Sequence, residues 1–156
     1  MEELFFLKTC AILHDIGKIL CWAEARPPEE HIYYTEQLIR DSLNLEVAIS
    51  AMRHHTSPSY PIEYHPKSDV EKIVALADNI ASGADRPEPT TKTKRVSLTH
   101  VLSKNFKIRD WNYDALKDIS AQIFNKLKEI SPIFNKDIRE GYHRIFSALD
   151  EIEDLK

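Results

Sequence analysis

Hydrophobic residues recur at helical spacing along most of this chain. From about Glu3 to Leu20 they occupy nearly every face of a helix, a pattern typical of a segment in the middle of a bundle. The same spacing predicts two shorter helices over residues 30–43 and 45–55, separated near Asn44. No alternation of apolar and polar positions is sustained over 5 residues. The sequence therefore predicts an all-α fold.

The second half of the chain continues this pattern. Ser68 and Glu71 fit a capping box that opens a helix, and Gly83 is a natural place for that helix to end. The buried stripe expected on this helix consists of Val70, Ile73, Val74, Ala77 and Ala81. After a link rich in proline and threonine, two amphipathic helices are predicted over about 112–131 and 137–154. Their apolar positions are Leu116, Ile119, Ile123, Leu127 and Ile130, then Ile138, Tyr142, Ile145, Leu149 and Ile152.

Composition narrows the class of protein. A chain of 156 residues with 42% apolar and 29% charged residues can bury a core, which argues against intrinsic disorder. A net charge of −4 removes any argument for nucleic-acid binding from bulk charge. Cys10 and Cys21 form neither a CxxC motif nor a disulfide framework, which favours a cytoplasmic location. Since no signal peptide or uncharged apolar run of about 20 residues is found, no membrane partner is expected.

The pair His14-Asp15 lies within the most apolar stretch of the chain. A buried carboxylate is costly unless it binds a cation or accepts hydrogen bonds, so this pair is a candidate for cation binding. Lys18 follows one turn after His14 on the same side of the predicted helix. The alternative is an aspartate at a helix surface beside a hydrogen-bonded histidine, with Lys18 extending toward solvent.

A second pair is His54-His55. Adjacent side chains of a continuing helix diverge by about 100° and would not reach one ion together. Pro58 disfavours helical backbone at Ser57, so we expect the helix to end near Thr56 and the two imidazoles to converge. The alternative is two exposed histidines at a helix C-terminus, where the helix dipole favours them.

Asp78 and His31 complete a candidate ligand set. Taken singly, Asp78 is explained as a hydrogen-bonded core residue and His31 as a surface residue near a helix start. Taken together with the two pairs, they supply enough imidazoles and carboxylates for one or two divalent transition-metal ions. This mixture suits Mn, Fe, Co, Ni or Zn better than Ca or Mg. The candidate metal ligands are His14, Asp15, His31, His54, His55 and Asp78.

The order of these ligands resembles the HD superfamily of metal-dependent phosphohydrolases. The strings LHDIGK at 13–18 and LAD..ASG..R at 76–86 look like the N-terminal HD nuclease domain of the large, polymerase-like subunit of type III CRISPR effector complexes, closest to the Csm class. The segment Arg95–Ser103 is loosely similar to a linker of that family. The resemblance covers roughly residues 5–105.

The resemblance implies an HD-domain helical bundle of the circularly permuted type. It implies an HD core over residues 1–90, a basic linker over 91–110 and a C-terminal helical appendage over 111–156 that packs on the core. In that family a further ligand histidine lies in a later segment, similar to SLYDHS, which this sequence lacks. We therefore expect a piece of a longer protein with one metal position short of a ligand. His143 is a candidate substitute.

The activity implied by the resemblance is metal-dependent cleavage of single-stranded DNA. Asp15 would bridge two ions, with His14 and Asp78 on one and the histidines of positions 31, 54 and 55 on the other. His14, Asp15 and Lys18 are the candidate catalytic residues, and Lys18 would neutralise charge on phosphate oxygens. The implied partners are the other subunits of a CRISPR ribonucleoprotein with its guide and target RNA.

A basic segment follows the predicted metal-bearing helix. Between Lys92 and Arg109 there are no acidic residues, and His100 and Phe106 could stack on bases. The candidate nucleic-acid contacts are Lys92, Lys94, Arg95, Lys104 and Lys107. A solvated basic loop explains this segment equally well. Four tyrosines flank the candidate ligands, where they either stack on a base or pack in the fold; they are Tyr33, Tyr34, Tyr60 and Tyr64.

Two other functions are compatible with the same sequence. One is an HD phosphohydrolase that acts on a nucleotide or a cyclic dinucleotide, which a deep closed pocket would favour. The other is a non-catalytic interaction module, in which the histidines and aspartates stabilise the core and the C-terminal helices dock on neighbouring subunits. Metal analysis separates the last hypothesis from the first two.

Overall fold

A computed structural model describes residues 1–84 and 113–152 of the chain, which are mostly helical. No β-strand occurs among these residues, so the prediction of an all-α fold is confirmed. The α-helices are α1 (Glu2–Leu13), α2 (Gly17–Ala23), α3 (His31–Ser42), α4 (Leu45–Met52), α5 (Asp69–Ala84), α6 (Tyr113–Phe134) and α7 (Ile138–Asp150). Short 3-10 turns occupy Pro28–Glu30 and Ile62–Tyr64.

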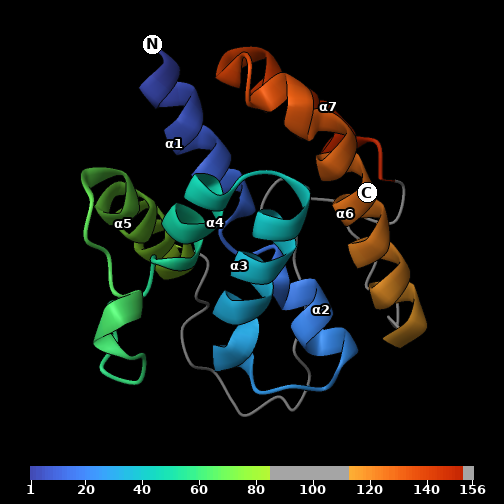
Figure 1. Ribbon diagram of the computed structural model, residues 1–156. Coiled ribbons are helices and arrows are strands. Elements are labelled where there is room, and N and C mark those ends of the chain that lie inside the picture. Colours follow the sequence, from blue (N-terminus) through green and yellow to red (C-terminus); the bar gives the residue numbers. More distant parts are fainter. Residues whose placement is uncertain (85–112, 153–156) are drawn as a thin grey trace.

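The helices pack around α1, α3 and α4 (Figure 1). Helix α3 packs against both α2 and α4, while α1 contacts α4, α5 and α7. Helices α6 and α7 pack against each other and cover the side formed by α2, α3 and α1. Helix α5 lies on the opposite side, against α1 and α4. None of the described helices combines the length and apolar composition needed to cross a membrane.

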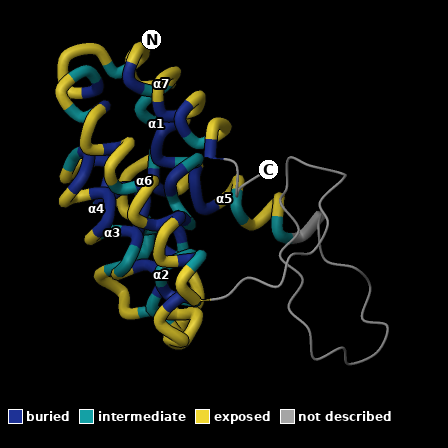
Figure 2. The backbone as a smooth tube through the Cα atoms, turned by 90° about the vertical axis from the view of Figure 1, so that its right-hand side faces the viewer, coloured by how far each residue is buried: buried dark blue, intermediate teal, exposed yellow. Residues whose placement is uncertain are grey.

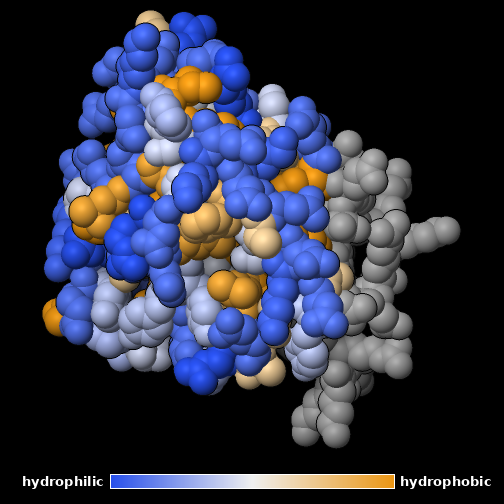
Figure 3. Space-filling model, turned by 45° about the vertical axis from the view of Figure 1, so that its right-hand side comes forward, coloured by the Kyte–Doolittle hydropathy of each residue, from blue (hydrophilic) through white to orange (hydrophobic). Residues whose placement is uncertain are grey.

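One hydrophobic core joins the two halves of the described chain. Leu13, Ile39 and Val47 from the first half meet Ile123 and Ile145 from α6 and α7, and all five are at most 1% exposed. The predicted stripe of α6 is buried along its whole length: Leu116, Ile119, Ile123, Leu127 and Ile130. On the face of the molecule shown in Figure 3, hydrophobic residues form small patches among hydrophilic ones. The predicted boundaries near residues 90 and 110 lie outside the described residues.

Two predicted helix starts are confirmed by side-chain caps. The Oδ1 atom of Asn44 accepts hydrogen bonds from the amides of Glu46 (2.8 Å) and Val47 (3.2 Å), so α4 starts directly after Asn44. At α5 the Ser68 hydroxyl accepts from the amide of Glu71 (3.2 Å), and the Glu71 carboxylate accepts from the amide of Ser68 (2.9 Å). This capping box sets the start of the helix that carries Asp78.

The prediction of one continuous helix from Glu3 to Leu20 is wrong. Helix α1 ends at Leu13 and α2 begins at Gly17, with a turn between them. The amide of Gly17 donates to the Thr35 hydroxyl of α3 (3.0 Å), and that hydroxyl donates to the carbonyl of His14 (3.2 Å). A side chain from another helix therefore takes over main-chain hydrogen bonds in this turn, which no local pattern could indicate.

The expected buried stripe of α5 is wrong in part. Val74 is 1% exposed, but Ile73 is 49% exposed, and Ala77 and Ala81 are exposed as well. Figure 2 shows that the later half of α5 stands away from the other helices. Only the first turns of α5 pack on α1 and α4. Helical spacing therefore identified an apolar face, but it could not show how much of that face other helices cover. The helix extends one residue past the predicted stop, to Ala84.

Candidate metal centre

The structure brings the predicted ligands together from four separate segments. His14 and Asp15 lie in the turn between α1 and α2, and His31 is the first residue of α3. His54 and His55 directly follow α4, and Asp78 lies on α5. His31 and His54 are almost fully buried, whereas the others are partly accessible. The candidate site therefore lies where four helix ends or faces meet.

Main-chain carbonyls orient three of the imidazoles. The Nδ1 atoms of His14, His31 and His54 lie 2.8, 2.6 and 2.8 Å from carbonyl oxygens three residues earlier in the chain. A carbonyl only accepts, so each Nδ1 carries the proton and donates it. Nε2 is then the nitrogen of each ring that is left to bind a metal, the arrangement that second-shell hydrogen bonds impose on histidine ligands. These three imidazoles are preset for ligation.

The same contacts explain why α4 ends early. The sequence predicts a helix end near Thr56, but α4 ends at Met52, and Arg53 has left the helical region with φ −93° and ψ 61°. Nδ1 of His54 donates a hydrogen bond to the carbonyl of Ala51. In a continuing helix that carbonyl would instead accept a hydrogen bond from the amide of His55. Because both histidines lie beyond the helix, their rings can approach each other, with centroids 4.0 Å apart. The predicted convergence is thus observed, although its cause is not Pro58.

Asp15 lies at the centre of the cluster. One carboxylate oxygen, Oδ1, is 3.3 Å from Nε2 of His31 and 3.5 Å from Nε2 of His54. The other, Oδ2, is 3.4 Å from Nε2 of His14 and also pairs with the ammonium of Lys18. The two oxygens therefore face different histidines, as a bridging carboxylate requires.

Two overlapping groups have the spacing of a metal site. His31, His54 and His55 form one, and His14, Asp15 and His54 form the other; within each, the ligand atoms all lie within 4.8 Å of one another. Asp78 adjoins the second group, with Oδ1 3.4 Å from Nε2 of His14. The sequence assigned His54 to one ion alone, whereas the geometry makes it common to both groups.

Two buried atoms at the centre have no hydrogen-bond partner. They are Nε2 of His14 and Oδ1 of Asp15. Leaving buried polar atoms unsatisfied is costly, and both atoms are of the kinds that coordinate transition metals. A divalent ion bound here would give both atoms a partner. The residues present therefore fit the metal that the ligand order implies.

The charges at His14 and Asp15 stabilise each other. Burial disfavours a charged imidazole, but the close carboxylates of Asp15 and Asp78 outweigh it and raise the pKa of His14 to about 10. Burial also opposes ionisation of Asp15, but the surrounding imidazoles outweigh it and hold the pKa of Asp15 far below its ordinary value. Without a metal, His14 is therefore protonated and Asp15 ionised at neutral pH.

The outer residues of the cluster respond differently. Burial, together with the neighbouring imidazoles of His54 and His31, lowers the pKa of His55 to about 3. His55 is therefore neutral at pH 7 and has a lone pair available. The pKa of the Asp78 carboxyl is lowered, chiefly by the adjacent His14. Asp78 is thus an anion at neutral pH, as a metal ligand should be.

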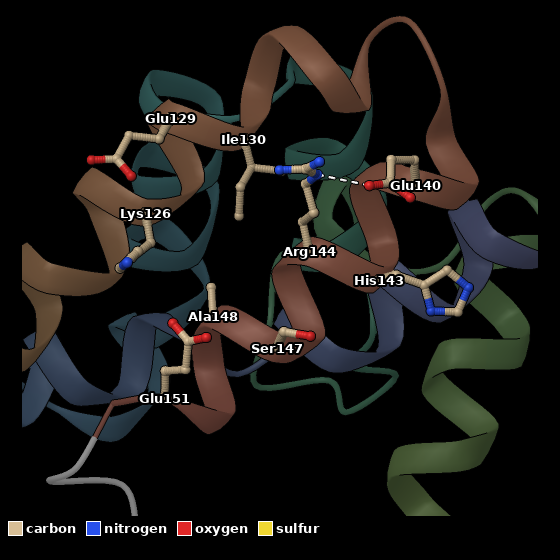
Figure 4. Close-up of a pocket in the computed structure, with 9 residues that line it drawn as sticks. All are labelled: Lys126, Glu129, Ile130, Glu140, His143, Arg144, Ser147, Ala148 and Glu151. Carbon is tan, nitrogen blue, oxygen red and sulfur yellow. Dashed lines mark hydrogen bonds and ion pairs between the residues drawn. The ribbon is translucent and has the colours of Figure 1, made fainter.

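The remaining predicted site residues do not lie among the six candidate metal ligands. The ammonium of Lys18 lies against Asp15, and its action on a phosphate stays a prediction. His143 lies on α7 beside a shallow pocket between α6 and α7 (Figure 4), and its ring contacts Phe5 and Tyr142 instead of the histidine cluster. The basic residues Lys92, Lys94, Arg95, Lys104 and Lys107 lie outside the described residues.

Sequence reasoning missed Thr35, which holds the turn that carries His14 and Asp15. Its side chain is fully buried and bonds to both Gly17 and His14. The available signal was a polar residue on the apolar stripe of α3, three positions after Ile32 and four before Ile39. Of the flanking tyrosines, Tyr60 stacks on His55, and Tyr33 packs edge-on against Tyr64.

Comparison with known proteins agrees with this site. A family model described as the HD domain matches residues 2–83, which include all six candidate ligands. No curated protein and no solved structure matches the chain. The family consists in general of metal-dependent hydrolases that bind divalent ions. Since the match covers more than half of the chain, this protein belongs to the HD domain family.

Proposed function

We propose that this protein is a metal-dependent phosphodiesterase that cleaves single-stranded DNA, as the HD nuclease domain of a type III CRISPR effector complex. The observation that carries the hydrolase proposal is the Asp15 carboxylate, whose two oxygens face different histidines while Oδ1 has no hydrogen-bond partner. The nuclease assignment is supported by the strings at 13–18 and 76–86. The circularly permuted arrangement is part of the same proposal.

The candidate ligands form two sets, each of which would bind one divalent ion. His14, Asp15 and Asp78 would hold one ion, and His31 and His55 the other. His54 belongs to both groups of ligand atoms and could therefore bind either ion. Bound there, a divalent ion would lower the pKa of a coordinated water toward about 7 and offset negative charge on phosphate oxygens.

The protein itself prepares the site for this chemistry. Carbonyl hydrogen bonds fix the imidazoles of His14, His31 and His54 before any ligand arrives, so little reorganisation is needed. Lys18 holds one oxygen of Asp15 through its ion pair. Because the Lys18 side chain is partly exposed (36%), its ammonium can also remain near an incoming phosphate. Lys18 therefore serves first to orient Asp15 and then to add positive charge at the edge of the site.

The hydrolase proposal is tested by incubating the purified protein with linear and circular single-stranded DNA and Mn²⁺, Co²⁺ or Ni²⁺. We expect both substrates to be cut, because cleavage of the circle requires endonuclease activity. Asp15→Asn and His14→Ala should reduce the rate by at least about 100-fold, as loss of a principal electrostatic group does. Asp69→Asn is the matched control on α5, since the Asp69 side chain is 94% exposed and should leave the rate unchanged.

Outcomes other than DNA cleavage separate the alternative functions. Intact DNA with every metal, from protein shown to bind metal, would reject single-strand cleavage. Turnover of free nucleotides or cyclic dinucleotides under the same conditions would instead favour the alternative phosphohydrolase. Absence of metal binding together with intact DNA would leave the non-catalytic interaction module.

The place in a CRISPR effector has its own test. The chain is assembled with the other subunits of a type III complex, guide RNA and target RNA, and cleavage of single-stranded DNA is followed. We expect cleavage to depend on target RNA and to stop with His14→Ala/Asp15→Ala. Failure of the chain to join the complex would reject this assignment while leaving the hydrolase proposal intact.

A further inference from the structure

His55 differs from the other histidines of the cluster in how its ring is held. His14, His31 and His54 each use Nδ1 to donate to a main-chain carbonyl. For Nδ1 of His55 the described residues provide no such acceptor, and its Nε2 lies 3.1 Å from Nε2 of His31. An imidazole without a second-shell hydrogen bond needs some other restraint if it is to ligate a metal with a fixed orientation.

The ring of Tyr60 supplies that restraint. It lies parallel to the imidazole of His55, with centroids 4.3 Å apart and an interplanar angle of 5°. It also meets His31 edge-on, at 6.5 Å and 90°. Stacked aromatic pairs are stabilised beyond the area that they bury, so the ring restricts rotation of His55.

The loop that carries Tyr60 is itself held in place. The amide of Tyr60 donates to the carbonyl of Ser57 (3.0 Å), which closes a turn. The carbonyl of Tyr60 accepts a hydrogen bond from Nε2 of His65 (3.0 Å). Because both main-chain groups are bonded, the position of the Tyr60 ring is set by the fold. The face that stacks on His55 is therefore not available to a nucleobase.

We infer that Tyr60 is a positioning residue for the metal site formed by His31, His54 and His55. The inference rests on the proposed metal centre, whose second group of ligands does not include His55. Loss of the stacked ring leaves the carbonyl bonds of the other three imidazoles intact. Tyr60 should therefore affect one metal site and spare the group of His14, Asp15 and His54.

The experiment is a calorimetric titration of metal-free protein with Mn²⁺ and with Co²⁺. We expect Tyr60→Leu to weaken binding at the site of His55 by about 10-fold or more, the usual effect of losing an outer-shell partner. Binding at the other site should change little. Tyr60→Phe keeps the ring without the hydroxyl and should restore wild-type affinity.

Tyr64→Leu is the matched control. Tyr64 lies in the same loop, but its ring packs edge-on against Tyr33 (5.3 Å, 89°) and not against a histidine of the cluster. This variant should lose some thermal stability while keeping wild-type metal affinity at both sites. A merely structural role for Tyr60 would give Tyr60→Leu the same behaviour as Tyr64→Leu. If Tyr60→Leu does not fold, Tyr60→Gln, which also lacks the ring, replaces it in the titration.

The outcomes separate this inference from the nuclease proposal. Wild-type metal affinity in Tyr60→Leu, or weakened affinity in Tyr60→Phe, overturns the inference whatever the DNA assay shows. Selective loss in Tyr60→Leu with rescue by Tyr60→Phe supports it, even if wild-type protein leaves DNA intact. A wild-type protein that binds no metal overturns it together with the metal centre.

Discussion

At the scale of single residues, the centre depends on which nitrogen of each histidine carries the proton. Carbonyl acceptors hold the proton on Nδ1 of His14, His31 and His54, which directs Nε2 toward Asp15. The close carboxylates of Asp15 and Asp78 then favour a second proton on His14. A metal and this second proton compete for the same lone pair, so metal affinity should depend on pH.

Metal affinity is predicted to rise with pH. The pKa of His14 is about 10, above the ordinary 6.5, so between pH 6.5 and 9 the metal must displace a proton from His14. One displaced proton raises the apparent affinity about 10-fold per pH unit. His55, with a pKa of about 3, is already neutral in that range and adds no dependence. Calorimetry in buffers of different ionisation enthalpy should count about one released proton. An affinity independent of pH would contradict this.

Cys10 is predicted to be unreactive in the folded protein. It is fully buried, and burial raises the pKa of its thiol to about 12, so the reactive thiolate is scarce at pH 8. Cys21 is also buried, and burial raises its pKa. A colorimetric thiol reagent should therefore label neither cysteine in native protein and both in denaturant. Rapid labelling without denaturant would mean that the core opens locally.

At the scale of elements, the turn between α1 and α2 determines the direction in which the side chains of His14 and Asp15 point. Gly17 lies so close to α3 that an added Cβ would be 2.2 Å from the Thr35 amide nitrogen and 2.4 Å from the His31 carbonyl oxygen. Both neighbours are main-chain atoms, which cannot move aside without shifting α3. The small residue thus joins the His14-Asp15 turn to the first turn of α3, where His31 lies.

Gly17→Ala is predicted to lower both stability and metal affinity. Forcing α2 and α3 apart should cost about 1–3 kcal/mol of unfolding free energy, the usual range for overpacking, and should displace His31. Gly141→Ala is the control, because its Cβ would be 2.5 Å from Cα of Phe134, between α6 and α7. It should destabilise the protein without changing metal affinity. Urea unfolding and calorimetry measure the two quantities, and equal metal affinities in both variants would refute the link.

The capping box of α5 carries a separate prediction. Ser68→Ala removes the hydroxyl that accepts from the amide of Glu71, so the unfolding free energy should fall by about 1 kcal/mol. Ser82→Ala, near the other end of α5, removes only a hydrogen bond to the carbonyl of Asn79 and should cost less. Urea unfolding of the two variants compares them. A larger loss in Ser82→Ala would show that the box contributes little.

At the scale of the whole molecule, the candidate ligands come from α3, α5 and the ends of α1 and α4. A bound ion therefore ties together segments that the core already packs, and it binds only the folded arrangement. The hydrophobic core reaches from α1 to α7 and supports these segments from behind. Metal binding should consequently act on the stability of the whole domain.

Metal is predicted to stabilise the protein against unfolding. At a free metal concentration of about 100 times Kd, the gain is about 2.7 kcal/mol for one site. Thermal unfolding with Mn²⁺, Co²⁺, Ni²⁺ or Zn²⁺ should show a higher Tm, and a chelator should reverse the shift. Asp15→Asn should abolish most of the shift, while the exposed control Asp69→Asn should keep it. A Tm unchanged by every metal would argue against the metal centre.

Sequence by itself determined the helical class, the break between helices near Asn44, the capping box of Ser68 and Glu71, the buried stripe of α6 and the identity of the candidate ligands. These features depend on local spacing and on side chains within one turn of each other, and such information is present in a short segment. The ligand order was also sufficient to indicate the HD family, because it does not require knowledge of where the helices lie.

Only the tertiary structure decided how those ligands face one another. The Thr35 hydroxyl breaks the first predicted helix from a position 18 residues away from Gly17. The imidazole of His54 ends α4 by donating a hydrogen bond to the carbonyl of Ala51. The later half of α5 is exposed because α1 and α4, the helices that α5 packs against, do not cover it. Each of these outcomes arises because a side chain or a neighbouring helix competes with a regular main-chain hydrogen bond or covers a surface. Periodicity along the chain carries no information about such competition.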